Sequence, residues 1–192
     1  MTSRTSSPPP VVLQERDRVF LKALYDCDGV LSYTQTRAHF YPGIADSTFD
    51  NRLRQLKHNQ YIHYPTTEQK REHPVPDRTV YWLGVKGIAE VAAHYGVDAD
   101  FPNTLSNDAL NKYARRLRMQ NIRWVREPHW RYLKHHLAVC DGRFLARAAA
   151  KKAALIWQGW TAESVFRADR SLQTVTYTVQ EVRRGGQIVD VE

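Results

Sequence analysis

The spacing of apolar positions predicts two helices near the start of the chain. Residues 1–10 are rich in serine, threonine and proline without any apolar rhythm, so we expect a disordered tail there. Over 11–27 apolar residues recur every three or four positions, and the Asp-Gly pair that follows is a typical helix stop. Ser32 then stands where a helix cap is needed, and the next helical pattern reaches about Phe40.

A third helix is expected within 46–63, and its sides differ in character. Ser47 is a suitable N-cap, and Phe49, Leu53 and Leu56 form one apolar stripe that would face a core. The other sides carry residue types that hydrogen-bond base edges and phosphates, namely Thr48, Asn51, Arg52, Arg54, Gln55, Lys57 and His58. This pattern is typical of a helix that reads DNA, and also of an ordinary solvated helix with a hairpin behind it.

Two short strand patterns follow the third helix, at 61–64 and 80–83, and a polar loop separates them. A further helical pattern covers 85–95 and is closed by a glycine. Helix, strand, charged loop and strand in this order are typical of a winged helix. The sequence therefore predicts a winged helix-turn-helix DNA-binding domain over 11–96.

The loop over 66–78 would form the tip of the wing. Lys70, Arg71, His73 and Arg78 have the charge and length to reach a phosphate backbone. Three carboxylates lie among them, so a solvated turn explains the same composition.

The second half of the chain is expected to be a basic helix-plus-sheet domain over 106–192, after an acidic, proline-containing linker at 97–105. A helix is predicted from the cap Ser106 to about Arg118. Between 112 and 134 aromatic residues are interspersed among eight cations and one carboxylate. The cations are Lys112, Arg115, Arg116, Arg118, Arg123, Arg126, Arg131 and Lys134. We expect Arg115, Arg116 and Arg118 to contact DNA, and the aromatic rings to belong to the core.

A long amphipathic helix is predicted over 129–155, followed by strands at 161–168 and 173–182 and a hairpin turn at 184–187. The expected fold class is α+β: an N-terminal winged helix-turn-helix followed by a basic helical segment and a small antiparallel β hairpin or sheet.

Composition and charge narrow the classes of partner. The chain has 192 residues with a formal net charge of +8, which favours nucleic acid. The charge is uneven, because 11–96 carries 11 Lys and Arg against 10 Asp and Glu, whereas 97–192 carries 16 against 10. Cys27 and Cys140 show no pairing or metal-binding spacing, and no membrane-length apolar run or apolar leader is seen. We therefore expect a cytoplasmic protein with no membrane partner.

No sequence pattern indicates catalysis. A phosphate-binding glycine loop, a Cys-x-x-Cys pair and a nucleophile elbow are all lacking from the sequence. His135, His136 and Asp141 would diverge around a helix, and we expect Asp141 to bond locally or to pair with Arg143 or Arg147. Our expectation is that the protein is not an enzyme, with no catalytic residue, metal ligand or cofactor.

Several short motifs resemble the replication-relaxation family of plasmids, integrative elements and phages. They are Arg16-Asp17, Arg52-Leu53-Arg54-Gln55-Leu56, Val80-Tyr81-Trp82-Leu83-Gly84 with Lys86-Gly87, the run from His135 to Asp141, and Trp160-Thr161-Ala162-Glu163. The resemblance implies an N-terminal winged helix, a smaller helix-plus-sheet half, and a link to plasmid replication and DNA relaxation or transfer. Many members continue into a nuclease-like Pro-Asp and acidic-x-Lys pattern that this sequence does not match, so we expect a second half shortened relative to the family.

These observations favour a sequence-specific double-stranded DNA-binding protein of a mobile element. It would act as a transcriptional regulator or as a replication or transfer accessory factor, and a homodimer is expected because one winged helix reads few base pairs. Two alternatives stay open: the remnant of a metal-dependent nuclease, and an interaction module that recruits a relaxase or replication initiator.

Overall fold

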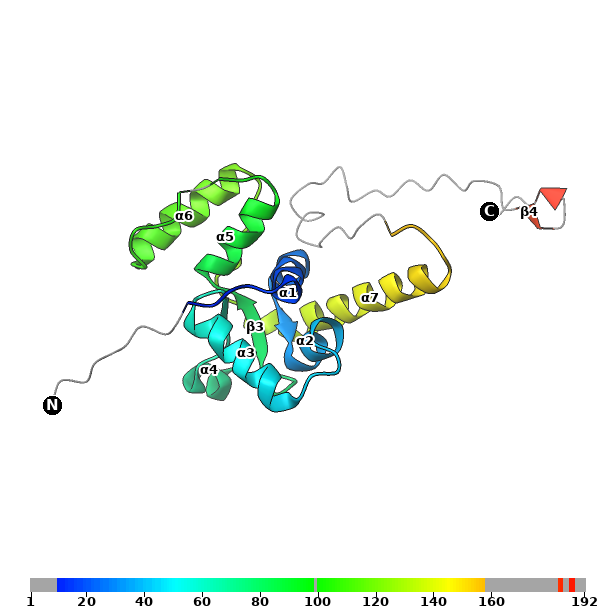
Figure 1. Cartoon of the computed structure of the whole chain (residues 1–192), viewed down its shortest axis with the longest axis horizontal. Helices are drawn as coiled ribbons and strands as arrows, with labels where there is room; N and C mark the ends of the chain where they lie inside the picture. Colours follow the sequence, from blue (N-terminus) through cyan, green and yellow to red (C-terminus); the bar gives the residue numbers. More distant parts are fainter. Residues whose placement is uncertain (1–9, 99, 158–182, 185–186, 189–192) are drawn as a thin grey trace. The chain divides into compact units, whose positions relative to one another are not determined.

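The computed structural model describes residues 10–98, 100–157, 183–184 and 187–188. The chain is α+β, rich in helix, with a small antiparallel sheet of three strands (Figure 1). It divides into two units, 1–160 and 161–192. The first contains α1 (Glu15–Asp26), β1 (Leu31–Ser32), α2 (Tyr33–Phe40), α3 (Asp46–His58), β2 (Ile62–His63), α4 (Thr67–Glu72), β3 (Val80–Leu83), α5 (Val85–His94), α6 (Asn107–Met119), the 3-10 turn η1 (Trp130–Tyr132) and α7 (Leu133–Lys152).

The first helix begins later than the apolar rhythm predicts. Its N-cap is Gln14, whose main-chain amide donates a hydrogen bond of 2.7 Å to the Asp17 carboxylate, so the segment before it, including Val11, is not helical. The predicted stop is confirmed, since α1 ends just before the Asp-Gly pair, where Gly29 has a φ of +92°. A Cβ at Gly29 would also meet the Val125 side chain at 2.6 Å.

The predicted N-cap of α2 is confirmed, whereas the predicted N-cap of α3 is not. Ser32 caps α2 as predicted, because its hydroxyl accepts the amide hydrogen of Gln35 at 3.1 Å. The prediction that Ser47 caps α3 was wrong. Ala45 is the N-cap, Ser47 lies inside the first turn, and Asp46 supplies the negative charge that favours a helix N-terminus.

The sheet has β3 at its centre, and both neighbours run antiparallel in the order β1-β3-β2. All four residues of β3 are buried, and successive side chains face opposite sides of the sheet. Tyr81 and Leu83 join the main core, which also contains Phe20 of α1. Val80 and Trp82 join a second cluster with residues of α7. Because both faces of β3 are covered by packed side chains, every residue of this strand can be apolar or aromatic.

The start of α5 lies directly against the chain entering β2. The amide of Gly84 donates to the carbonyl of Tyr61 at 2.9 Å, and the amide of Lys86 donates to the carbonyl of Gln60 at 3.0 Å. A Cβ at Gly84 would come within 2.2 Å of the Gln60 oxygen, and one at Gly87 within 2.0 Å of the Tyr61 oxygen. Both positions therefore need glycine because two main-chain segments are in contact there.

The connection between β2 and β3 is partly helical, whereas a loop was predicted over 66–78. Thr66 caps the short helix α4, its hydroxyl accepting from the Gln69 amide at 3.2 Å while the Gln69 side chain accepts from the Thr66 amide at 2.9 Å. This reciprocal capping box is a local signal that the polar composition obscured.

The core does not separate at the predicted linker, 97–105. Tyr113 and Leu117 of α6, Ile122, and Cys140 of α7 belong to the same buried cluster as the first three helices. The Trp124 indole donates to the carbonyl of Leu83 at 3.0 Å, which fixes the chain after α6 to the end of β3. Residues 106–157 therefore pack with the first half in one unit and do not form a separate domain.

The remaining predictions near the C-terminus had mixed outcomes. The long helix begins at Leu133 after the turn η1, not at His129, and ends at Lys152. In the second unit, β4 (Arg183–Arg184) pairs antiparallel with β5 (Gln187–Ile188), which confirms the predicted hairpin. The strands predicted at 161–168 and 173–182 lie outside the described residues. Among the helices of the described region, none has both the length and the apolar character needed to cross a membrane.

Candidate nucleic-acid interface

Helix α3 has one side fixed in the core and one side open to solvent. Phe49, Leu53 and Leu56 are buried, with exposed fractions of 0%, 3% and 0%. The opposite side presents predicted contact residues that are all exposed, namely Thr48, Asn51, Arg54, Gln55 and His58. The Arg54 guanidinium donates to the side-chain oxygen of Asn51 at 2.7 Å, which orders both on the outer surface.

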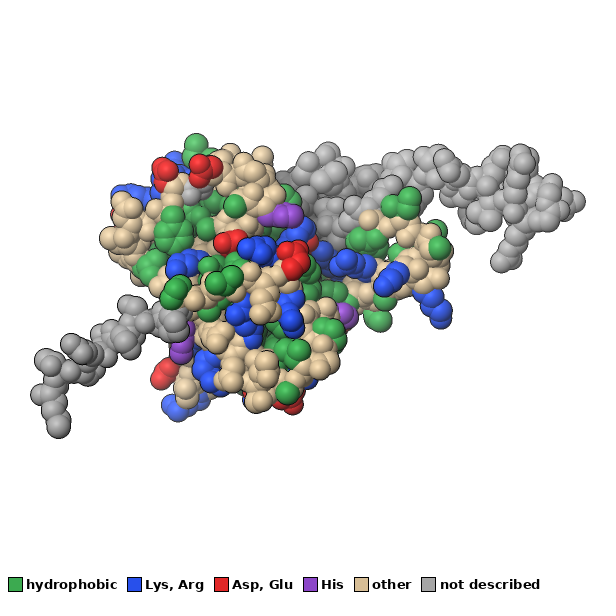
Figure 2. All heavy atoms as spheres, in the orientation of Figure 1, with side chains coloured by type: hydrophobic (Ala, Val, Ile, Leu, Met, Phe, Trp, Pro, Cys, Tyr) green, Lys and Arg blue, Asp and Glu red, His purple; other side chains and the backbone are tan. Residues whose placement is uncertain are grey.

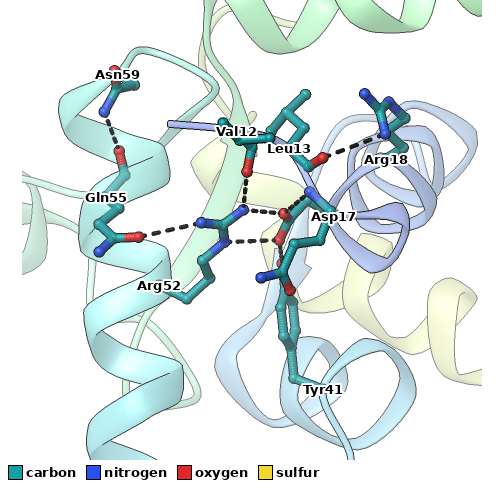
Figure 3. Close-up of polar contacts among 9 residues, drawn as sticks. Val12, Leu13, Asp17, Arg18, Tyr41, Arg52, Gln55 and Asn59 are labelled. Atoms are coloured by element: carbon teal, nitrogen blue, oxygen red, sulfur yellow. Dashed lines mark hydrogen bonds and ion pairs between the residues drawn. The ribbon is translucent and has the colours of Figure 1, made fainter. Parts of the chain in front are cut away.

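Arg52 points the other way, into the molecule (Figure 3). Its Nε donates to Asp17 Oδ1 at 3.1 Å, and its Nη2 forms an ion pair with Asp17 Oδ2 and donates to the carbonyl of Val12 at 2.8 Å. Its Nη1 donates to the Gln55 side chain at 3.2 Å. The structure therefore places Arg52 in an internal ion pair, and only its Nη1 reaches another predicted base contact, Gln55.

Asp17 is the acceptor at the centre of this network and is fully buried. Burial by itself would raise its pKa, but hydrogen bonds from Arg52, the Tyr41 hydroxyl (2.7 Å) and the Gln14 amide outweigh burial and lower the pKa below 3.8. The hydrogen bond between Arg52 and Asp17 in turn raises the pKa of Arg52. Burial, and then the charge of Asp17, raise the pKa of Tyr41, so the phenol stays neutral.

The sequence did not lead us to Asp17 as the partner of Arg52, or to Tyr41 as a further donor to Asp17. A signal was present, because Asp17 lies on the buried side of α1 together with Phe20, Leu21 and Leu24. An acid in an apolar stripe needs a cation or several donors near it. The pattern does not show which cation that is, since Arg52 lies 35 residues away along the chain.

Cations from three segments line a hollow of about 210 Å³ beside α3. Arg54 comes from α3, Lys70 from α4, and Arg78 from the approach to β3. Arg78 is held by Asp50 at 3.0 Å and by the Tyr33 hydroxyl at 2.9 Å, and Lys70 donates to its carbonyl at 3.3 Å. Thr79 also lines this hollow. Its hydroxyl oxygen is buried and has no hydrogen-bond partner among the described residues.

The other predicted wing and helix residues differ in how they are held. The Lys57 ammonium lies 3.9 Å from the centre of the Tyr64 ring, and Arg71 is exposed on α4. His73 is stacked on Trp130, with ring centres 5.1 Å apart and planes 9° apart. His73 therefore packs against the start of the 3-10 turn and is not at the hollow.

The basic helix α6 presents Arg115, Arg116 and Arg118 to solvent. Arg116 is paired with Asp100 at 3.4 Å. Three of the four aromatic residues of 112–134 are in or against a core as predicted, since Tyr113 is buried and Trp124 and Trp130 are partly buried. The prediction was wrong for Tyr132, which is 42% exposed. Figure 1 places α6 apart from α3 and α4. On the face of the molecule that Figure 2 shows, Lys and Arg side chains lie in several separate groups.

Of the residues considered for metal binding, His135 and Asp141 are exposed, and the hydrogen-bond partner of Asp141 is distant in the chain, not local as expected. Asp141 accepts a hydrogen bond of 2.7 Å from the Gln35 side chain of α2, whereas Arg143 pairs with Asp26 at 2.9 Å. Within the described part of the chain, no three His, Cys, Asp or Glu residues are grouped as metal ligands.

Comparison with known proteins adds no relative: no family model, no curated protein and no solved structure matches the chain.

Proposed function

We propose that this chain binds double-stranded DNA as a winged-helix protein, with α3 in the major groove and 66–78 as the wing. The observation that carries the proposal is the uncovered polar side of α3, whose opposite side is locked in the core. The order α1-β1-α2-α3-β2-α4-β3, with β3 between β1 and β2, supports the proposal because this order presents α3 and the β2–β3 connection, which contains α4, on one side.

The contacts divide by chemistry. Asn51 and Gln55, with Thr48, carry the amide and hydroxyl groups that read base edges. Contacts to phosphate come from the rest of the surface, namely the imidazole of His58 and the cations Arg54, Lys57, Lys70, Arg71, Arg78, Arg115, Arg116 and Arg118. Arg52 is left out of this surface, because its guanidinium holds α3 to α1.

The hollow beside α3 suits one backbone phosphate. It is lined by Arg54, Lys70 and Arg78 against a single carboxylate, Asp50. A phosphate there would accept hydrogen bonds from guanidinium and ammonium groups next to the base-reading side of α3.

The biological role in this proposal is that of a regulator, or of an accessory factor at a replication or transfer origin, in a mobile element. It rests on the resemblance to the replication-relaxation family. A cytoplasmic homodimer is part of the proposal, since two copies would extend the short site that one α3 can read. A replication or transfer protein is a further proposed partner.

The test is selection of bound fragments from the source genome, followed by affinity measurements on the selected site and a scrambled site. The double variant Asn51→Ala, Gln55→Ala should reduce the preference for the selected site by about 10-fold to 100-fold, because removing a bidentate hydrogen bond to a base costs about 1–3 kcal/mol. Asn103→Ala, an exposed asparagine outside the proposed surface, is the matched control and should retain the preference.

Two results would overturn the proposal. One is a double variant that folds and keeps the full preference for the selected site. The other is a wild-type protein that binds all DNA weakly with a shallow dependence on salt, which is the behaviour of a module that binds another protein.

A further inference from the structure

Cys27 and Cys140 lie together in the core although 113 residues separate them in the chain. Cys27 follows the last residue of α1, Cys140 lies in α7, and their exposed fractions are 4% and 2%. The Sγ of Cys140 is 3.6 Å from the carbonyl oxygen of Cys27 and 3.7 Å from that of Val30. The Cys140 thiol also donates a hydrogen bond to the Cys27 sulfur.

A buried arginine is directed at one of the two sulfurs. Arg143, three residues after Cys140 on α7, donates from Nη1 to the Sγ of Cys27 at 3.2 Å. Its Nη2 is fixed by Asp26 at 2.9 Å, and the residue is 9% exposed. Two thiols need no charged partner to pack in a core, and a buried ion pair costs desolvation. The guanidinium therefore has a consequence beyond packing: it stabilises a negative charge on Cys27.

The two sulfurs are not equivalent. The hydrogen bond from Cys140, together with the charge of Arg143, lowers the pKa of Cys27 against the opposing effects of burial and of Asp26. The hydrogen bond to Cys27, and then burial, raise the pKa of Cys140. Cys27 is thus the sulfur that ionises, and Cys140 is the thiol that remains protonated beside it.

We propose that Cys27 and Cys140 are a peroxide-oxidised pair that closes an internal disulfide between the end of α1 and the middle of α7. Both sulfurs are buried, so the oxidant must be small and uncharged, as hydrogen peroxide is. This inference does not depend on DNA binding.

The reaction has two steps. The Cys27 thiolate attacks one oxygen of hydrogen peroxide, the O–O bond breaks, and Cys27 becomes a sulfenic acid while the other oxygen leaves as hydroxide. The Cys140 thiol gives its proton to that hydroxide, and its sulfur attacks the Cys27 sulfur. A disulfide forms, the sulfenic oxygen leaves as hydroxide, and the proton that Cys27 released when it ionised converts this hydroxide to water. Overall, two thiols lose two electrons and two protons, and one peroxide becomes two waters.

The experiment uses the full-length protein, reduced and then freed of reductant, with a series of hydrogen peroxide concentrations. We expect both free thiols to be lost together and the intact mass to fall by two hydrogens. A protease digest without reductant should contain one peptide pair linked through Cys27 and Cys140. The midpoint of thermal unfolding should rise, because the bond closes a long loop in the unfolded chain.

Variants assign the roles of the residues. In Cys140→Ser the sulfenic acid on Cys27 should persist and react with dimedone, whereas in Cys27→Ser the remaining thiol should react slowly. Arg143→Met should slow thiol loss by about tenfold or more, because less of Cys27 is ionised. Arg147→Met, one turn further along α7 and exposed, is the matched control and should react at the wild-type rate.

The wild-type protein by itself can overturn the proposal, even if a variant does not fold. It would be overturned by a folded protein that keeps both thiols under peroxide that oxidises the same thiols in urea. A disulfide between two chains would also overturn it. A Cys27→Ser variant that reacts as fast as wild type would show that Cys27 is not the attacking sulfur.

Discussion

At the scale of single residues, the contrast between Arg52 and Arg54 shows how one helix serves two purposes. Both are arginines in the same turn of α3, but Arg52 has an exposed side-chain fraction of 14% and Arg54 is open to solvent. Arg52 meets a carboxylate that is fully buried, so removal of its guanidinium leaves a charge in the core without its cation.

We expect Arg52→Met to lower the free energy of unfolding by about 3 kcal/mol or more, because half of a buried ion pair is removed. Arg54→Met is the matched control and should change it by less than about 0.5 kcal/mol, as at an exposed position. Urea unfolding at neutral pH measures both. Equal effects of the two substitutions would contradict the internal role of Arg52.

The pH dependence provides a second check on the same pair. The folded-state pKa of Asp17 is below 3.8. The contribution of Asp17 to stability is therefore fully present above pH 3.8 and is lost as the pH falls through the folded-state pKa. The stability difference between wild type and Arg52→Met should therefore narrow as the pH is lowered toward and below 3.8. A difference that does not depend on pH would show that the carboxylate is not the partner that matters.

At the scale of the elements, the parts predicted correctly are those with a local physical cause. Ser32 before α2 and Ser106 before α6 were recognised because an N-cap acts within three residues. The stripe of Phe49, Leu53 and Leu56 likewise fixes which side of α3 is buried. The candidate site was predictable only in part. The apolar stripe shows which residues of α3 face outward, but it does not show that Arg52 forms an ion pair with a carboxylate from another helix.

Helix α6 is the element whose proposed role can be separated from that of α3. Replacing Arg115, Arg116 and Arg118 together by alanine should weaken binding to the selected and scrambled sites by a similar factor, because interactions with phosphate carry no sequence information. The slope of log affinity against log salt should become shallower by about 0.9 for each phosphate that is no longer neutralised. Fluorescence anisotropy at several salt concentrations measures both, and a weakening confined to the selected site would contradict the backbone role.

At the scale of the whole molecule, residues 106–157 complete the core of the first half. Tyr113 and Leu117 join the main cluster, while Leu133 and Leu137 cover the second face of β3. A domain boundary at 97–105 was reasonable from composition, since that segment is acidic and contains proline. Composition cannot show that the next helices return to the same core, because that depends on packing between residues far apart in the chain.

A fragment ending at residue 96 should therefore lose cooperative unfolding and expose apolar surface, because Val80 and Trp82 would lose their cover. A fragment of residues 10–157 should retain a sharp transition. Thermal unfolding followed by circular dichroism, with binding of a hydrophobic dye, distinguishes them. A cooperative transition in the shorter fragment would show that 11–96 is an independent domain after all.

The anchoring of α4 has a consequence for the energetics of association. Gln69 donates to Glu127 at 2.7 Å, the Trp130 indole donates to the same carboxylate at 2.9 Å, and His73 stacks on Trp130. The connection between β2 and β3 is thus tied to Glu127 and to the 3-10 turn η1 that precedes α7, and Lys70 and Arg78 keep their places without a ligand. A partner that meets them need not first freeze a mobile arm, so less of the interaction energy is offset by lost conformational entropy.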